Sequence, residues 1–220
     1  MGEAQIETKV KVDVVKPEEI PHILEPGEIG AVLELVVSAR DGQVTEKRVM
    51  KSKSFVRRFL EILWAQFLWP AGKGYLSSRD YAGGYASVGG QHENFYAGGG
   101  AGVTNHGVLV GTGTTPPTVD DYVMENQIAH GVGAGQLQYG ATTFGAPASD
   151  ATTAQFTVTR NFANGSGAAV TVNEIGLAVQ SYQTSSVSMR HLIIRDVIAG
   201  GISVPNGQTL TVNYRIQVVA

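Results

Sequence analysis

From residue 107 to the C-terminus, the sequence consists of short segments in which apolar and polar residues alternate, separated by turns rich in glycine, asparagine and proline. The last segment is the clearest, because every second residue from Leu210 to Val218 is large and apolar. A period of two sends successive side chains to opposite faces, so each segment predicts a strand with one buried face. Such strands, at spacings of roughly 10–20 residues, predict a mainly β protein, an antiparallel β-sandwich of jelly-roll type.

The individual strands follow from this alternation. They are predicted over residues 107–111, 136–144, 154–162, 168–179, 189–198, 202–204 and 210–219. Asn164–Gly167 and Asn206–Gly207 are predicted turns. Gly176 lies inside a predicted strand and indicates a bulge or a close approach of another segment. A short helical turn is expected over residues 121–128, capped by Thr118 or Asp120.

The N-terminal segment, residues 6–15, also alternates and predicts a strand with one charged face. Three prolines follow it, and proline is excluded from central strands. We therefore expect this strand to be an arm that pairs with a neighbouring copy of the chain. The interface candidates on its apolar face are Val10, Val12 and Val14.

A β-hairpin is predicted after the arm. Residues 31–39 and 44–50 form its strands, and Asp41-Gly42 between them is a pair favoured in type I′ turns. The arm and the hairpin together make up the first predicted region of the chain, residues 1–51.

One amphipathic helix is predicted within residues 52–70. Apolar residues recur at helical spacing over residues 55–69, Ser52 or Ser54 can cap the start, and Pro70 ends it. More than one side of this helix is apolar, so it packs under its own sheet, lies at a subunit interface or rests on a membrane surface. The interface candidates on it are Phe55, Phe59, Trp64, Phe67 and Trp69.

Residues 71–107 form a Gly/Tyr-rich segment that contains 11 of the chain's 28 glycines. A loop of this length without secondary structure is uncommon and is usually functional or disordered. Flexible backbone combined with aromatic side chains is typical of binding loops. The candidate ligand contacts in this loop are Tyr75, Tyr81, Tyr85, Phe95 and Tyr96.

Charge is concentrated near the N-terminus, where residues 1–61 hold 21 of the 35 charged residues. The remaining surface, which includes the sandwich at residues 108–220, is poor in charge, which is unusual for a free monomer and favours a subunit covered by others. With a formal net charge of −3 and few basic clusters, no nucleic-acid partner is expected. No apolar run is long enough to span a bilayer, and the first residues lack a signal-peptide pattern.

No arrangement of residues predicts catalysis, a metal site or a cofactor. The chain has no cysteine, no helical pair of histidines, no phosphate-binding loop and no nucleophile elbow. Asp120 and Asp121 are predicted to cap or form a turn. Glu174 and Arg195 fall inside predicted strands, where charges are tolerated only when paired, so they predict a structural ion pair.

Several short stretches of the chain carry a resemblance to a known class of proteins. They are Asp41–Phe59, Gly111–Pro116, Asp120–Tyr122, Val172–Leu177, Arg195–Val197 and Ile202–Tyr214. Together they resemble tailed-phage virion structural proteins of the small tail, tail-tip or head-surface type. The resemblance implies a β-rich subunit that assembles symmetrically in a virion or a virion-like particle.

The expected function is therefore that of a structural subunit without catalytic activity. Its expected partners are further copies of itself and other virion proteins, and its expected place is the virion, assembled in the host cytoplasm. Two alternatives stay open. One is a receptor- or glycan-binding module that uses the Tyr-rich loop, and the other is a subunit of an extracellular filament.

Overall fold

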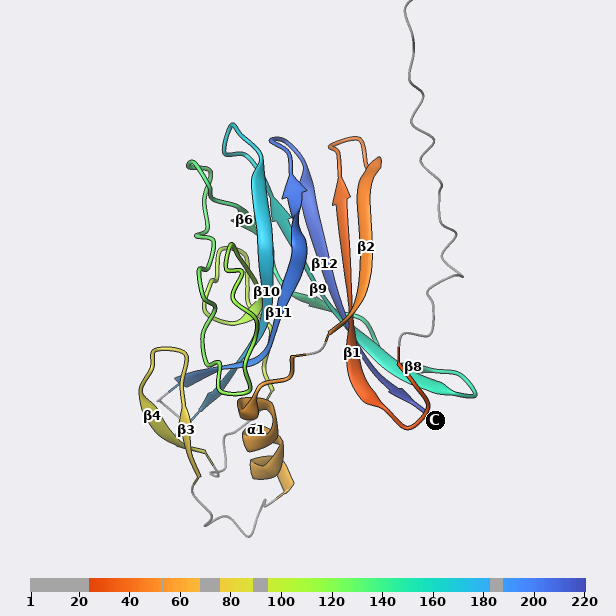
Figure 1. The fold of residues 1–220 in the computed structure, drawn as a ribbon, viewed down its shortest axis with the longest axis vertical. Coiled ribbons are helices and arrows are strands. Elements are labelled where there is room, and N and C mark those ends of the chain that lie inside the picture. Colours follow the sequence, from red (N-terminus) through yellow and green to blue (C-terminus); the bar gives the residue numbers. More distant parts are fainter. Residues whose placement is uncertain (1–23, 53, 68–75, 89–94, 183–187) are drawn as a thin grey trace, which may run out of the picture.

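The computed structural model describes residues 24–52, 54–67, 76–88, 95–182 and 188–220. Two antiparallel sheets face each other, and a helix and a small hairpin lie at one end (Figure 1). The fold is mainly β and sandwich-like, as the alternation predicts. The predicted arm at residues 6–15, with Val10, Val12 and Val14, lies outside the described residues.

The larger sheet, sheet A, has the strand order β2-β1-β12-β9-β6, and β7 and β8 also pair with β9. Its long strands are β1 (Ile29–Ser38), β2 (Val44–Ser52), β9 (Thr153–Ala163) and β12 (Thr209–Val219). Its short strands are β6 (Gln138–Tyr139), β7 (Thr143–Phe144) and β8 (Ala148–Ser149). Because β1 pairs with β12 along its whole length, the N-terminal hairpin and the C-terminal strands form one sheet.

The smaller sheet, sheet B, has the order β11-β10-β5. Its strands are β5 (Gly107–Gly111), β10 (Val170–Tyr182) and β11 (Ser188–Val204). The sequence predicts two strands where β11 is one. Gly200 and Gly201 have φ of 76° and 63°, a left-handed conformation open to glycine, so the strand bends there without ending.

The last four long strands form a Greek key that is folded across both sheets. β9 pairs with β12 in sheet A, and β10 pairs with β11 in sheet B. Their order is therefore 12-9-10-11, with the fourth strand beside the first. A Greek key of this kind is found in most β-sandwiches.

The core lies between the two sheets. Both inward faces supply fully buried apolar side chains, among them Leu33, Leu35, Val172, Ile175, Ile194, Leu210 and Tyr214. Gly176 pairs with Arg195 and faces the loop on the other side of sheet B, where a Cβ would meet Met124 Sδ at 2.5 Å. The predicted close approach at Gly176 is thus confirmed, while the register shifts of β10 lie on either side of it, between Val172 and Glu174 and between Leu177 and Ala178.

The first hairpin forms as predicted, but with another turn. Type I′ needs positive φ at both central residues, and only Gly42 has it, at 85°. The Gly42 N–H donates to the Ala39 carbonyl at 3.0 Å, so Arg40 and Asp41 are the central residues. Gly42 follows them in the left-handed conformation, which is the usual pattern of longer hairpin loops.

Helix α1 (Arg57–Phe67) begins later than predicted. Phe55 forms a β-bridge with Ile194, which keeps the chain extended to Val56. The Arg57 N–H donates to the Val119 carbonyl at 2.8 Å, so a neighbouring loop caps the helix and neither Ser52 nor Ser54 does. The predicted end at Pro70 lies outside the described residues.

The Gly/Tyr-rich segment contains secondary structure, contrary to its prediction as one long loop. β3 (Leu76–Arg79) and β4 (Tyr85–Val88) form a hairpin beside α1 (Figure 1). The short helix predicted over residues 121–128 is absent, and this stretch is a loop that lies along sheet B.

Candidate functional site

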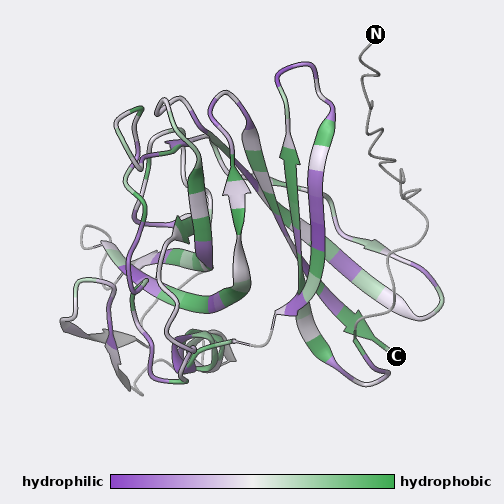
Figure 2. Cartoon of the chain, turned by 45° about the horizontal axis from the view of Figure 1, so that its top comes forward, coloured by the Kyte–Doolittle hydropathy of each residue, from purple (hydrophilic) through white to green (hydrophobic). Residues whose placement is uncertain are grey.

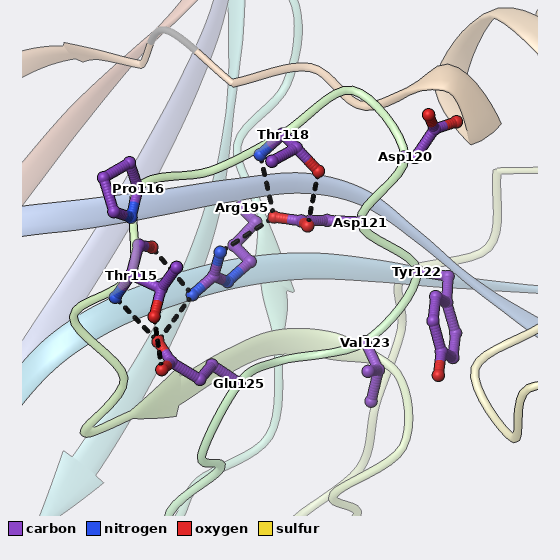
Figure 3. A pocket seen from close by; sticks show the side chains of 9 residues that line it. All are labelled: Thr115, Pro116, Thr118, Asp120, Asp121, Tyr122, Val123, Glu125 and Arg195. Atoms are coloured by element: carbon purple, nitrogen blue, oxygen red, sulfur yellow. Dashed lines mark hydrogen bonds and ion pairs between the residues drawn. The ribbon is translucent and has the colours of Figure 1, made fainter.

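A polar cluster around Arg195 joins sheet B to the loop that covers it (Figure 3). Arg195 extends from β11 and donates to three carboxylates, Glu174 on β10 at 2.9 Å, Asp121 at 2.8 Å and Glu125 at 3.1 Å. It also donates to the Thr115 carbonyl at 3.2 Å. Only 3% of the Arg195 side chain is exposed, so these contacts replace its hydration.

Glu174 is the innermost carboxylate of this cluster and is fully buried. It accepts backbone N–H groups of Gly113, Glu125 and Asn126, in addition to the guanidinium of Arg195. A Cβ at Gly113 would collide with the Glu174 and Glu125 side chains, so only glycine fits there. The predicted Glu174–Arg195 ion pair is confirmed, and it fixes the path of the loop.

The outer carboxylates of this cluster are held in their charged form. Burial by itself raises the pKa of Asp121, but hydrogen bonds from Thr118 and Arg195 outweigh it, so this pKa lies below its ordinary value. Hydrogen bonds from Thr115, followed by the charge of Arg195, lower the pKa of Glu125. Burial lowers the pKa of Arg195, and its contacts with Asp121 and Glu174 more than offset this, so its pKa is raised.

A shallow depression of about 290 Å³ lies over this cluster. Asp120 and Tyr122 line it but lie apart from the guanidinium (Figure 3). Asp121 also accepts from the backbone and hydroxyl of Thr118, which confirms the predicted turn role. Each carboxylate that contacts Arg195 already accepts several hydrogen bonds, so the arrangement suits a structural role better than proton transfer. We call the set of Arg195, Glu174, Asp121 and Glu125 the polar clasp.

A second buried cation orders the glycine-rich chain before β5. Arg160 on β9 is fully buried and donates to five backbone carbonyls at 2.6–3.3 Å. Those carbonyls belong to Gly100, Val103, His106, Val108 and Gly140. No carboxylate is among these acceptors, and burial lowers the pKa of Arg160 to about 10. Arginine provides five donors in a fixed plane, so a single side chain fastens this whole segment.

The aromatic candidates of the Gly/Tyr-rich segment are divided between the interior and the surface. Tyr81 donates to Gln127 Oε1 at 2.7 Å and packs against the core, and Phe95 packs there beside Phe59. Tyr85 is 72% exposed and Tyr96 is 50% exposed. Tyr75 lies outside the described residues. Of the four candidate rings that the structure describes, two are therefore exposed and two pack against the core.

The interface candidates on the helix are divided in the same way. Phe55 and Phe59 pack against the core. Trp64 is 42% exposed, and Leu60, one turn before it, is 64% exposed. Trp69 lies outside the described residues, and the structure does not describe the Phe67 side chain. The helix thus packs under its own sheet and leaves a pair of apolar side chains at the surface.

An exposed apolar surface comes from the end of sheet A that sheet B does not cover. Alternate residues of β1, β12 and β9 continue the core-facing rows beyond the row Leu33–Tyr214–Val158. In the next row Ala31 is still fully buried. We call the accessible side chains the uncovered face, and its members are Ile29, Ala154, Phe156, Ile216 and Val218, together with Phe144 of β7, which pairs with Val158. Sequence reasoning missed it, because alternation identifies a core-facing row without showing where the opposing sheet ends.

The uncovered face is accessible over much of its area. The exposed fractions are 72% for Ile29, 53% for Phe144, 40% for Phe156 and 45% for Val218. A depression of about 350 Å³ lies over Ala154, Phe156, Ile216 and Val218. Figure 2 shows hydrophobic stretches on the strands at this end, around the C-terminus, where β1 and β12 run away from sheet B. Contiguous exposed apolar surface of this kind marks interaction sites.

The histidines take separate positions. His106 contacts Asn105 at 2.8 Å, and His130 accepts the backbone N–H of Tyr139 at 3.0 Å. His191 is fully buried on β11, and burial lowers its pKa. Within the described ranges, no three His, Asp or Glu side chains gather closely enough to hold a metal ion. In the same part of the chain, no helix combines the length and hydropathy that a membrane span needs.

Comparison with protein families, with curated proteins and with solved structures gives no match to this chain.

Proposed function

We propose that this chain is a structural subunit that assembles with copies of itself, without catalytic activity, in a virion or a virion-like particle. The observation that carries the proposal is the uncovered face. It consists of core-facing rows of sheet A that continue past the edge of sheet B, with Ile29 at 72% exposure. Leaving such side chains in water costs about 25 cal/mol for each Å² of apolar area, so covering them favours association.

The polar clusters support a structural role. Arg195 and Arg160 fasten loops to the two sheets through internal hydrogen bonds. These contacts make a rigid subunit, and rigid partners lose less freedom when they associate. Two stretches that resemble phage virion proteins, Gly111–Pro116 and Val172–Leu177, meet at the polar clasp. Their resemblance favours the same proposal.

The mass of the full chain in solution tests this function. Light scattering over a range of protein concentrations should give a fixed multiple of the 23.2 kDa chain mass, because a closed assembly has a defined copy number. Electron microscopy of the same sample should then show rings, tubes or other symmetric particles. A mass of one chain at all concentrations would contradict the proposal.

A further inference from the structure

We propose that the N-terminal arm of a second copy, residues 6–14, lies on the uncovered face, with the apolar side of the arm in contact with that face. This inference rests on the proposed function and names the contact through which the copies join. The arm would add a strand opposite the part of sheet A that sheet B does not cover. Sheet A of one subunit would then gain its opposing layer from the next subunit.

The arm has the chemistry that this surface requires. Ile6, Val10, Val12 and Val14 share one face with Thr8, and the intervening residues are charged, so one side suits an apolar sheet and the other suits water. An extended segment of nine residues is about 30 Å long. The uncovered face crosses β1, β12 and β9 at about 4.8 Å per strand, so the arm is long enough to cross it.

The described chain begins at the end of sheet A that carries the uncovered face. Leu24 is 2% exposed and packs with Val32 and Val219. The Gly27 N–H donates to the Val219 carbonyl at 2.7 Å, which places this segment beside Ile29 and the uncovered face. The arm is therefore attached at the end of the molecule where the apolar surface lies.

The described chain begins, however, on the opposite side of the sheet. Val32 alternates with the core-facing Ala31 and Leu33, so Leu24 lies on the outer face of sheet A. To reach its own uncovered face, the chain would have to turn back around the sheet end within residues 15–23, which include Pro17 and Pro21. Proline fixes φ near −65° and favours an extended connector, which directs the arm to a neighbour.

Cross-linking of the full-length chain tests this contact, and the absence of native cysteine makes it selective. A tagged chain with Val12→Cys is mixed with an untagged chain with Ala154→Cys and treated with a bis-maleimide. Ala154 is exposed on the uncovered face. A heterodimer that contains the tag once is the expected product, identified by its mass.

Two matched variants show which faces meet. Gln155→Cys moves the thiol to the other side of β9, and Lys11→Cys moves it to the charged side of the arm. Because neighbouring side chains of a strand point to opposite faces, each should lower the heterodimer yield on the order of tenfold. Equal yields for Ala154→Cys and Gln155→Cys would overturn the inference.

Three further outcomes show whether the arm inference, the proposed function or both fail. If the variants assemble to the mass of the unmodified chain but Val12 and Ala154 do not cross-link between copies, the arm inference fails and the assembly proposal stands. If a single chain with both substitutions closes only on itself, the arm covers its own sheet, which also overturns the inference. A chain that stays monomeric contradicts both proposals.

Discussion

Arg195 is the residue on which the polar clasp depends, since it contacts Glu174, Asp121 and Glu125 from one buried position. Arg195→Met removes the cation and leaves the fully buried Glu174 carboxylate without it. Breaking a buried pair on one side costs about 3–5 kcal/mol, because the remaining charge is uncompensated. We expect the free energy of unfolding, measured by denaturant titration, to fall by this amount.

Arg57→Met is the matched control. Arg57 pairs with Asp120 at 3.1 Å, but the side chains are 56% and 62% exposed. Exposed pairs contribute about 0–1 kcal/mol, so this variant should unfold almost as the unmodified chain does. Equal losses for Arg57→Met and Arg195→Met would mean that the clasp has no special role.

The lowered pKa values of Asp121 and Glu125 predict a loss of stability in acid. In the unfolded chain these groups titrate near 3.8 and 4.5, and in the folded chain they titrate lower. A lowered folded pKa stabilises above the unfolded pKa, and this contribution is lost as the pH falls through the folded value. Asp121→Asn should therefore flatten the pH dependence of unfolding near and below pH 3.8, as measured by denaturation at several pH values. An unchanged slope would contradict this account.

The inner half of the clasp could be predicted from the sequence, whereas the outer half could not. Glu174 and Arg195 lie within predicted strands, where a buried charge is tolerated only when it is paired, so their pairing could be predicted. Asp121 and Glu125 lie in a loop, and periodicity does not determine where a loop passes. The role of the fully buried Arg160 was also missed. Its acceptors are backbone carbonyls, which every residue has, so residue types do not identify them.

At the scale of elements, close packing requires glycine at some positions before β5 and not at others. A Cβ at Gly99 would lie 2.5 Å from the His106 carbonyl oxygen, whereas at Gly100 the nearest atom would be Val103 Cγ2 at 3.9 Å. Gly99→Ala should lower the free energy of unfolding by about 1–3 kcal/mol, because backbone must move, and Gly100→Ala should change it little. Thermal unfolding monitored by circular dichroism measures both. Similar melting temperatures would show that this segment is not held as described.

The start of the helix illustrates a limit of local patterns. Ser52 and Ser54 have the right chemistry for a cap, but the bridge between Phe55 and Ile194 keeps this stretch extended. Tertiary pairing therefore overrides a local signal, and α1 begins at Arg57. The hairpin of β1 and β2 was predictable, since it depends only on an apolar segment, a returning segment and the Asp41-Gly42 pair between them.

At the scale of the whole molecule, the two sheets differ in extent. Sheet A continues past sheet B, and the uncovered face is the result (Figure 1). The alternation of β9 and β12 could not predict this, because Val158 and Phe156 follow the same pattern although one is 3% and the other 40% exposed. The low charge of residues 62–220 favours a subunit that is covered by others, and this stays a prediction.

The most direct test of the central claim, that the uncovered face joins the subunits, compares two adjacent residues of β9. Phe156→Asp places a charge on the uncovered face, and Thr157→Asp places the same charge on the opposite side. Light scattering should show that Phe156→Asp dissociates the assembly, since burying an unpaired carboxylate costs several kcal/mol, while Thr157→Asp keeps it. Circular dichroism verifies that both variants are folded. An assembly of unchanged mass in folded Phe156→Asp would contradict the account.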